Sequence, residues 1–336
     1  MRVSVIGAGV AGLTCALELA ERGAAVEVLE RGAAPGPHGC SWHAGGMLAP
    51  WCERENSEPL IAQLGLESLP WWQQRFPATQ RAGTLVVAHA RDAGELAQFA
   101  RRTQCFEPLA AAGITALEPE LAGRFVQGLY FRDEGHLDPR AALAGLVARL
   151  QELGVALRFN TEAHAARLVG RQVIDCTGLA ARTALPQLRG VKGEMLLLHL
   201  PELTLRRPVR VLHPRMPVYV VPRGAGYYMV GATMIESDED LRVSARSVLE
   251  LLSAAYALHP AFGEAQVVEL GTGVRAAFPD NLPRLLVRGS TLYVNGLFRH
   301  GFLIAPALAR RVAEVVLEGR HFPEVMDEDP GQRRLA

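Results

Sequence analysis

The first thirty residues restrict the fold of this chain more than any other stretch. Arg2–Ile6 is a short apolar run of the kind that forms a buried parallel strand, and a G-x-G-x-x-G motif follows it. In such a motif Gly7 permits a tight turn, Gly9 lets the backbone approach a pyrophosphate, and Gly12 lets a helix pack closely on the strand. The first amides of that helix would face the phosphates.

The residues after the motif favour a dinucleotide-binding βαβ unit. Gly23 stands where a helix of this length would end, and an apolar strand follows at residues 26–29. Glu30 comes at the end of that strand, 18 residues after Gly12, where a carboxylate accepts hydrogen bonds from a ribose 2′-hydroxyl. The same carboxylate would repel a 2′-phosphate, so NADP is disfavoured, while NAD and FAD both remain open.

A secretory signal is the alternative interpretation of this stretch, because Arg2 is followed by apolar residues. Glu18, Glu21 and Arg22 interrupt the apolar run, and no small-residue cleavage site follows it. We therefore favour the nucleotide site.

The composition indicates a protein that acts on small molecules. The 336 residues suffice for two domains, and the 35 basic residues balance the 35 acidic ones, which removes the bulk electrostatic argument for nucleic acid or an anionic membrane. No uncharged apolar run reaches the roughly 18 residues of a membrane helix. The five cysteines lack C-x-x-C spacing, which argues against a disulfide or zinc framework. We expect a cytoplasmic protein without a metal, and its oligomeric state, including a homo-oligomer, stays open.

Helical and strand-like patterns alternate along the rest of the chain. Residues 31–59 are rich in Gly and Pro and predict a long loop, whereas residues 91–121 suggest helical pieces. Further helices are predicted at residues 59–76, 138–154 and 243–259, and a last one from about Pro306 to Glu318. Strands are predicted at residues 83–90, 128–131, 155–159, 172–175 and 291–295. Five more β-like segments lie between residues 190 and 275, with a hairpin turn at Gly224 and Gly226.

Motifs spread over nearly the whole chain accompany the glycine turn. They are A-G-G-M-L at Ala44–Leu48, V-K-G-E at Val191–Glu194, Y-V-V-P-R and V-G-A-T-M up to Met234, G-V-R at Gly273–Arg275 before D-N-L-P, and F-R-H-G-F-L-I-A-P at Phe298–Pro306. With these motifs the chain resembles the D-amino acid oxidase superfamily of flavoenzymes, and in particular its glycine oxidase branch, which is associated with thiamine biosynthesis.

The resemblance implies an α/β protein with two domains. A discontinuous Rossmann-like FAD-binding domain would comprise residues 1–75, 135–190 and 270–336. An inserted α+β substrate domain with an antiparallel sheet would comprise residues 76–134 and 191–269.

The resemblance also implies that the dinucleotide is FAD. The loop at residues 44–47 would lie beside the isoalloxazine ring, the backbone near Cys40 would contact the cofactor, and residues 297–303 would return to the flavin. No cysteine lies beside Arg299, where sarcosine oxidases often carry a covalent flavin link, so we expect non-covalent FAD. The implied cofactor-binding residues are Gly7, Gly9, Val10, Ala11, Gly12, Glu30, Arg31, Cys40, Ser41, Ala44, Gly45, Gly46, Met47, Ala163, Leu297, Phe298, Arg299, His300, Gly301, Phe302 and Leu303.

Residue chemistry is consistent with a small amino acid as the substrate, because the rigid fork of an arginine binds a carboxylate bidentately. By the resemblance, Arg275 is the carboxylate-binding arginine and Tyr219 donates to the same carboxylate. Arg299 is a second arginine near the flavin, and Met47 and Met234 line the small pocket.

The chain departs from the family pattern at two places. Ala276 replaces the proline that usually follows the substrate arginine, and His300 replaces a common asparagine. Neither His43 nor His300 has a neighbour at a spacing that suggests a catalytic base, so we assign none.

The function implied by the resemblance is oxidation of glycine, or of sarcosine or a D-amino acid, to the 2-oxo acid, ammonia and hydrogen peroxide. A hydride would pass from Cα to flavin N5, molecular oxygen would be the acceptor, and the product would serve synthesis of the thiamine thiazole. The alternatives are a D-amino acid, sarcosine or proline dehydrogenase that reduces a quinone, an NAD-dependent dehydrogenase, and a flavin sensor without catalysis.

Overall fold

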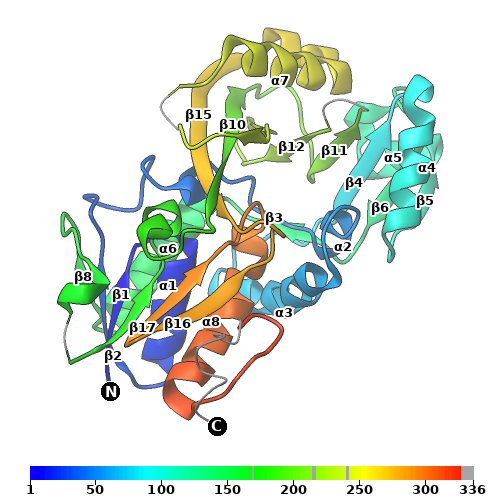
Figure 1. Cartoon of the computed structure of the whole chain (residues 1–336). Coiled ribbons are helices and arrows are strands. Elements are labelled where there is room, and N and C mark those ends of the chain that lie inside the picture. Colours follow the sequence, from blue (N-terminus) through cyan, green and yellow to red (C-terminus); the bar gives the residue numbers. More distant parts are fainter. Residues whose placement is uncertain (169, 214–216, 240–241, 327–336) are drawn as a thin grey trace.

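A parallel sheet forms the half of the molecule that contains both ends of the described chain (Figure 1). The computed structural model describes residues 1–168, 170–213, 217–239 and 242–326. The sheet has the strand order β16-β17-β9-β1-β2-β8, and β16 alone runs antiparallel to its neighbour. Its strands are β1 (Arg2–Ile6), β2 (Ala25–Leu29), β8 (Ala156–Arg158), β9 (Gln172–Asp175), β16 (Arg284–Arg288) and β17 (Thr291–Asn295). The sheet therefore joins segments that are far apart in the sequence.

Four helices pack together beside this sheet: α1 (Val10–Glu21), α3 (Pro59–Arg75), α6 (Pro139–Glu152) and α8 (Gly301–Glu318). Helix α1 contacts both α6 and α8, and α3 contacts α8. Leu13, Leu17, Ile304 and Leu308 are fully buried in the common core. Asp138 caps α6, because its side chain accepts hydrogen bonds from the amides of Arg140 and Ala141.

The start of the last helix differs from the prediction. Helix α8 begins at Gly301 and includes Pro306, although a proline was expected to open it. Proline lacks the N–H that would donate to the carbonyl four residues earlier. That carbonyl belongs to Phe302, and it accepts a 2.7 Å hydrogen bond from the indole of Trp72 instead. The interior proline is tolerated because α3 satisfies the free carbonyl.

The second sheet is mixed but mostly antiparallel. Its order is β14-β10-β13-β12-β11-β4-β6-β5, with β15 on the other edge of β10. The pair β4–β11 is parallel, which the prediction of an antiparallel sheet did not include. The strands are β4 (Thr84–Ala88), β5 (Glu107–Ala110), β6 (Gln127–Phe131), β10 (Arg189–His199), β11 (Val209–Leu212), β12 (Val218–Pro222), β13 (Tyr227–Gly231), β14 (Ile235–Glu236) and β15 (Gln266–Ala277).

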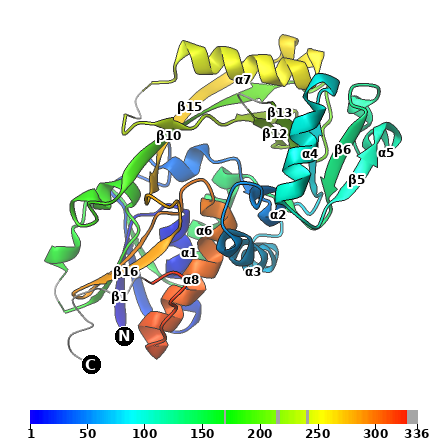
Figure 2. The same ribbon diagram turned by 45° about the vertical axis from the view of Figure 1, so that its right-hand side comes forward.

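Helix α7 (Ala245–Leu258) crosses the far side of this sheet, and α4 (Ala93–Arg102) and α5 (Ala111–Leu117) lie beside β4 and β6 (Figure 2). Leu251, Ala255 and Leu258 of α7 are fully buried in the sheet's own core. Strand β5 falls where the sequence suggested helical pieces, so that assignment was wrong, and no element was predicted where β16 lies.

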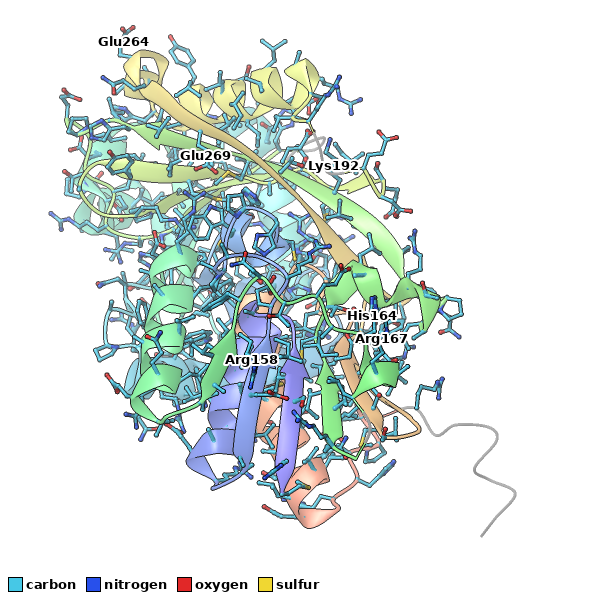
Figure 3. All side chains as sticks on the ribbon, turned by 90° about the vertical axis from the view of Figure 1, so that its left-hand side faces the viewer. Arg158, His164, Arg167, Lys192, Glu264 and Glu269 are labelled. Carbon is cyan, nitrogen blue, oxygen red and sulfur yellow. The ribbon has the colours of Figure 1, made fainter. Side chains whose placement is uncertain are left out.

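The long ribbon of β10 and β15 connects the two sheets. Figure 3 shows Lys192 and Glu269 along it, Glu264 at its upper end and Arg158 on the six-stranded sheet below. The segment predicted as a loop, residues 31–59, lies between the sheets and contains a 3-10 turn (Cys40–His43), β3 (Met47–Leu48) and α2 (Pro50–Glu53), with β3 paired to β7 (Gly135–His136). The domain limits stay a prediction. No helix in the described ranges is long and apolar enough to cross a membrane.

Candidate active site

The glycine turn has the geometry that a dinucleotide cradle requires. Gly7 has φ of +97°, and a Cβ at Gly12 would overlap the Gly7 carbonyl, so α1 lies directly on the turn. The amide of Val10 donates to Ser41 Oγ at 3.1 Å. This bond brings the predicted loop at residues 40–41 to the start of α1.

Glu30 is buried at the end of β2 and fixes the neighbouring loop. Its carboxylate accepts hydrogen bonds from the amides of Ala8 and Gly32, at 2.7 and 2.8 Å, and lies 3.0 Å from His38 Nε2. The Glu30 carbonyl accepts from the amide of Thr161 at 2.8 Å. The segment that carries Ala163 therefore lies next to Glu30, while Arg31 is exposed beside them.

The loop at residues 44–47 is held from the second sheet. Arg223 donates to the carbonyls of Ala44 and Leu137, at 2.8 and 2.6 Å. A Cβ at Gly45 would lie 2.8 Å from the ring of Tyr219, so the backbone approaches that ring closely. No spacing or periodicity indicated a role for Arg223, although this residue ends the Y-V-V-P-R motif.

The turn between β17 and α8 completes the nucleotide side. A Cβ at Gly301 would lie 3.5 Å from Val10 Cγ1, and the amide of Phe298 donates to the carbonyl of Ala276 at 3.2 Å. Phe302 and Leu303 are buried, and Phe302 stacks on Trp72 between α3 and α8. Their side chains therefore face the helical core, and only their backbone is left for a cofactor contact.

Arg275 and Tyr219 lie together on the substrate side. Arg275 pairs with Val191 across the ribbon, and a Cβ at Gly193 would overlap its guanidinium. The guanidinium donates to the Thr233 carbonyl at 3.2 Å. Burial lowers the pKa of Arg275 and raises the pKa of Tyr219, and the charge of Arg275 counteracts the latter shift.

Arg299 lies near this pair but has a carboxylate partner. Its Nη2 is 2.6 Å from Glu53 Oε2, and its Nη1 is 3.7 Å from Met234 Sδ. Met234 is 56% exposed at the edge of the site. Met47 lies on β3 and pairs with His136 of β7. Its side chain packs against the buried hydrophobic cluster that includes Cys52 of α2.

Glu53 is the main site residue that sequence reasoning missed. His300 Nδ1 lies 3.4 Å from Glu53 Oε2, and Arg210 Nη1 lies 3.6 Å from Glu53 Oε1. Burial alone would raise the pKa of Glu53, but the charges of Arg299 and Arg210 outweigh it and lower the pKa to about 2. Burial lowers the pKa of His300 to about 4, so its imidazole is neutral at pH 7. No periodicity or motif in residues 31–59 pointed to Glu53.

Glu134 holds the helix that carries Glu53. Its Oε1 accepts hydrogen bonds from the amides of Trp51 and Cys52, at 2.9 and 2.7 Å, at the start of α2. Ala49 at the N-cap has no side chain for this purpose, so a residue distant in sequence caps the helix. Burial raises the pKa of Glu134 to about 8. Within the described residues, no group of three or more His, Cys, Asp or Glu could hold a metal ion.

This arrangement joins a nucleotide-binding parallel sheet, whose β17–α8 turn carries Arg299, to a mixed sheet that carries Arg275 and Tyr219, and it is the arrangement of a flavin-dependent oxidoreductase. The chain belongs to the FAD dependent oxidoreductase (DAO) family, which residues 2–315 match. The predicted superfamily, the fold class and the FAD-dependent enzyme class are thereby confirmed.

Named relatives support the same placement. The chain is 54% identical over 325 residues to a putative thiamine biosynthesis oxidoreductase, ThiO, of Rhizobium etli, covering 96% of this chain and 99% of the relative. It is 26% identical over 362 residues to a glycine oxidase of Geobacillus kaustophilus, covering 94% and 92% of the two chains. A crystal structure of a glycine oxidase from Bacillus cereus shares the fold with a TM-score of 0.83 at 19% identity, covering 98% of this chain and 99% of that one.

Proposed function

We propose that this enzyme uses molecular oxygen to oxidise glycine or a similar small amino acid, such as sarcosine or a D-amino acid, to the 2-oxo acid and hydrogen peroxide. The amine released is ammonia, or methylamine when the substrate is sarcosine. The names of its relatives support this substrate class and a role in synthesis of the thiamine thiazole. The single observation that carries the proposal is the setting of Arg275. In the described part of the chain no carboxylate lies within salt-bridge distance of its guanidinium. A partly buried, uncompensated guanidinium beside a tyrosine hydroxyl suits one carboxylate.

The residues around Arg275 would bind and orient the substrate. Arg275 and Tyr219 would hold its carboxylate, while the Gly45 backbone closes one side and Met47 and Met234 limit its size. FAD, when bound, supplies the acceptor for the hydride at its N5. The positive charge of Arg275 favours loss of a proton from the bound ammonium group. No protein base is assigned, because His300 is buried with Nδ1 3.4 Å from the Glu53 carboxylate and His43 Nε2 lies 3.1 Å from the Pro37 carbonyl.

The residues described around the glycine turn and the 44–47 loop would also bind FAD. The glycine turn and Ser41 would hold the pyrophosphate, Glu30 the adenosine ribose, and residues 44–47 and 297–301 the flavin end. We propose that the FAD is non-covalent, since no cysteine lies in residues 295–301. Flavin that stays with the protein pellet after acid precipitation would contradict this.

The decisive experiment is anaerobic bleaching of the flavin by glycine, sarcosine, D-alanine and D-proline. Arg275→Gln should raise the concentration needed for half-maximal bleaching by roughly 100-fold, because a charged bond of about 2–3 kcal/mol is lost. The FAD content should not change. Unaltered kinetics in this variant would sink the assignment of Arg275.

The same panel separates the alternatives. An oxygen electrode distinguishes an oxidase from a dehydrogenase that reduces a quinone. A yellow protein that none of the amines bleaches would instead be a flavin sensor.

A further inference from the structure

The two arginines of the proposed substrate site differ in their partners. Arg275 donates to a neutral carbonyl, that of Thr233. Arg299 forms a 2.6 Å ion pair with Glu53, and both side chains are largely buried, with 17% and 12% of their surface exposed. Charge on Glu53 is therefore already opposite Arg299 before any ligand binds.

Glu53 is rigidly held in this position. Arg210, which is 6% exposed, contacts Glu53 from the other side and stacks its guanidinium 5.1 Å from the ring of Phe99. Glu134 caps the short helix that carries Glu53. Glu53 is ionised at neutral pH, because its pKa is about 2.

The charges around the site leave one positive charge uncompensated. Arg299 is paired with Glu53, and Arg210 lies 3.6 Å from Glu55 as well as from Glu53. Glu134 is mostly protonated at pH 7, since its pKa is about 8. Arg275 remains as the one guanidinium of this group that lacks an acidic partner among the described residues.

We infer that Glu53 is a specificity-determining residue, which withdraws Arg299 from the ligand and so restricts the site to amines with a single carboxylate. This inference rests on the proposed function, because it takes the ligand to lie between Arg275 and Arg299. A second carboxylate on the ligand would meet Glu53, which repels it, in place of a free arginine. Dicarboxylic amines such as iminodiacetate should therefore be poor ligands of the wild-type enzyme.

The test compares two unreactive anions, acetate and malonate, whose dissociation constants are measured from the change in flavin absorbance of the FAD-loaded enzyme. In Glu53→Gln the affinity for malonate relative to acetate should rise at least about ten-fold. Arg299 is then free to form a charge-assisted hydrogen bond with the second carboxylate of malonate. Glu53→Asp keeps the charge and should stay near the wild-type ratio. The relative kcat/KM for iminodiacetate over glycine should rise in parallel with the malonate ratio.

Glu55→Gln is the matched control. Glu55 lies two residues from Glu53 and contacts Arg210 and Arg102, and no ion pair joins it to Arg299 in the described structure. This variant should leave the malonate-to-acetate ratio unchanged. Adding Arg299→Gln to Glu53→Gln should abolish the gain.

Two results would overturn the inference: an equal change for both anions in Glu53→Gln, or an equal rise in Glu55→Gln. Where Glu53→Gln does not retain FAD, the wild-type enzyme decides, since a withdrawn Arg299 predicts that malonate binds no more tightly than acetate, and tighter binding of malonate refutes the inference. A wild-type enzyme that oxidises none of the amines would refute the proposed function, whereas the anion ratios would still decide the role of Glu53.

Discussion

Close approach to Arg275 explains the glycine at position 193. The V-K-G-E motif places Gly193 on β10, directly under the guanidinium, where a Cβ would overlap its nitrogen atoms. The φ of Gly193 does not require glycine, so the constraint comes from the arginine and not from the backbone. Gly193 therefore sets the position of Arg275 without touching the substrate.

Gly193→Ala should displace the Arg275 guanidinium by roughly 1 Å, because the added Cβ would overlap its Nη2, and should raise the KM for the amine. An increase of roughly 10- to 100-fold is expected, since misplacement of a binding group by about 1 Å has that effect. The FAD content should stay the same. Gly94→Ala is the control, because a Cβ at Gly94 meets no atom within 4 Å. Equal KM values for Gly193→Ala and the wild type would contradict the placement of Arg275.

Helix α2 is the element that carries the acidic side of the site, and its stability depends on a buried acid. Its four residues are too few for a helix that forms on its own. The Glu134 carboxyl, which is fully buried, supplies the acceptor for its first amides. Glu53 therefore keeps its place opposite Arg299 only while Glu134 holds α2.

The raised pKa of Glu134 predicts how stability changes with pH. Between the ordinary value of 4.5 and about 8, the folded protein binds a proton that the unfolded chain has lost. The contribution of this group is thus fully present below pH 4.5 and is lost as pH rises toward 8, at up to about 1.4 kcal/mol per pH unit. A glutamine at this position does not ionise, so the Glu134→Gln variant lacks this pH-dependent decrease in stability. Its free energy of unfolding, relative to that of the wild type, should therefore rise from about pH 5 to about pH 8 and then level off. Denaturant unfolding at several pH values measures it, and Glu107→Gln, at an exposed ion pair, is the control. A constant difference across this range would show that Glu134 is charged when buried.

At the scale of the whole molecule, the sequence predicted the parts with local signals. The glycine turn, Glu30 and the apolar strands of the first sheet follow from spacing and periodicity, and the structure contains them as expected. Glu53, Glu134 and Arg223 could not be found in this way, since each acts on a group far along the chain. Glu134 caps a helix 82 residues away, and Arg223 holds a carbonyl 179 residues away. Such contacts depend on how the two sheets meet, which no local pattern encodes.

The proposed FAD site joins three distant segments, so the cofactor should stabilise the whole protein. Three segments meet at the start of α1: the glycine turn, residues 40–47 and residues 297–301. Few contacts join them, such as the hydrogen bond from the Val10 amide to Ser41 Oγ and the close approach of Gly301 to Val10. A ligand that bridges them binds the folded state alone and adds about 2.7 kcal/mol at a concentration 100 times its Kd. Apoprotein should therefore gain roughly 5 °C in Tm when FAD is returned at that excess. NAD at the same concentration is the control and should leave the Tm unchanged, because it lacks the flavin that residues 44–47 and 297–301 would hold. An equal shift with NAD would show that the adenosine end alone provides the stabilisation, and the flavin end would then have to be placed elsewhere.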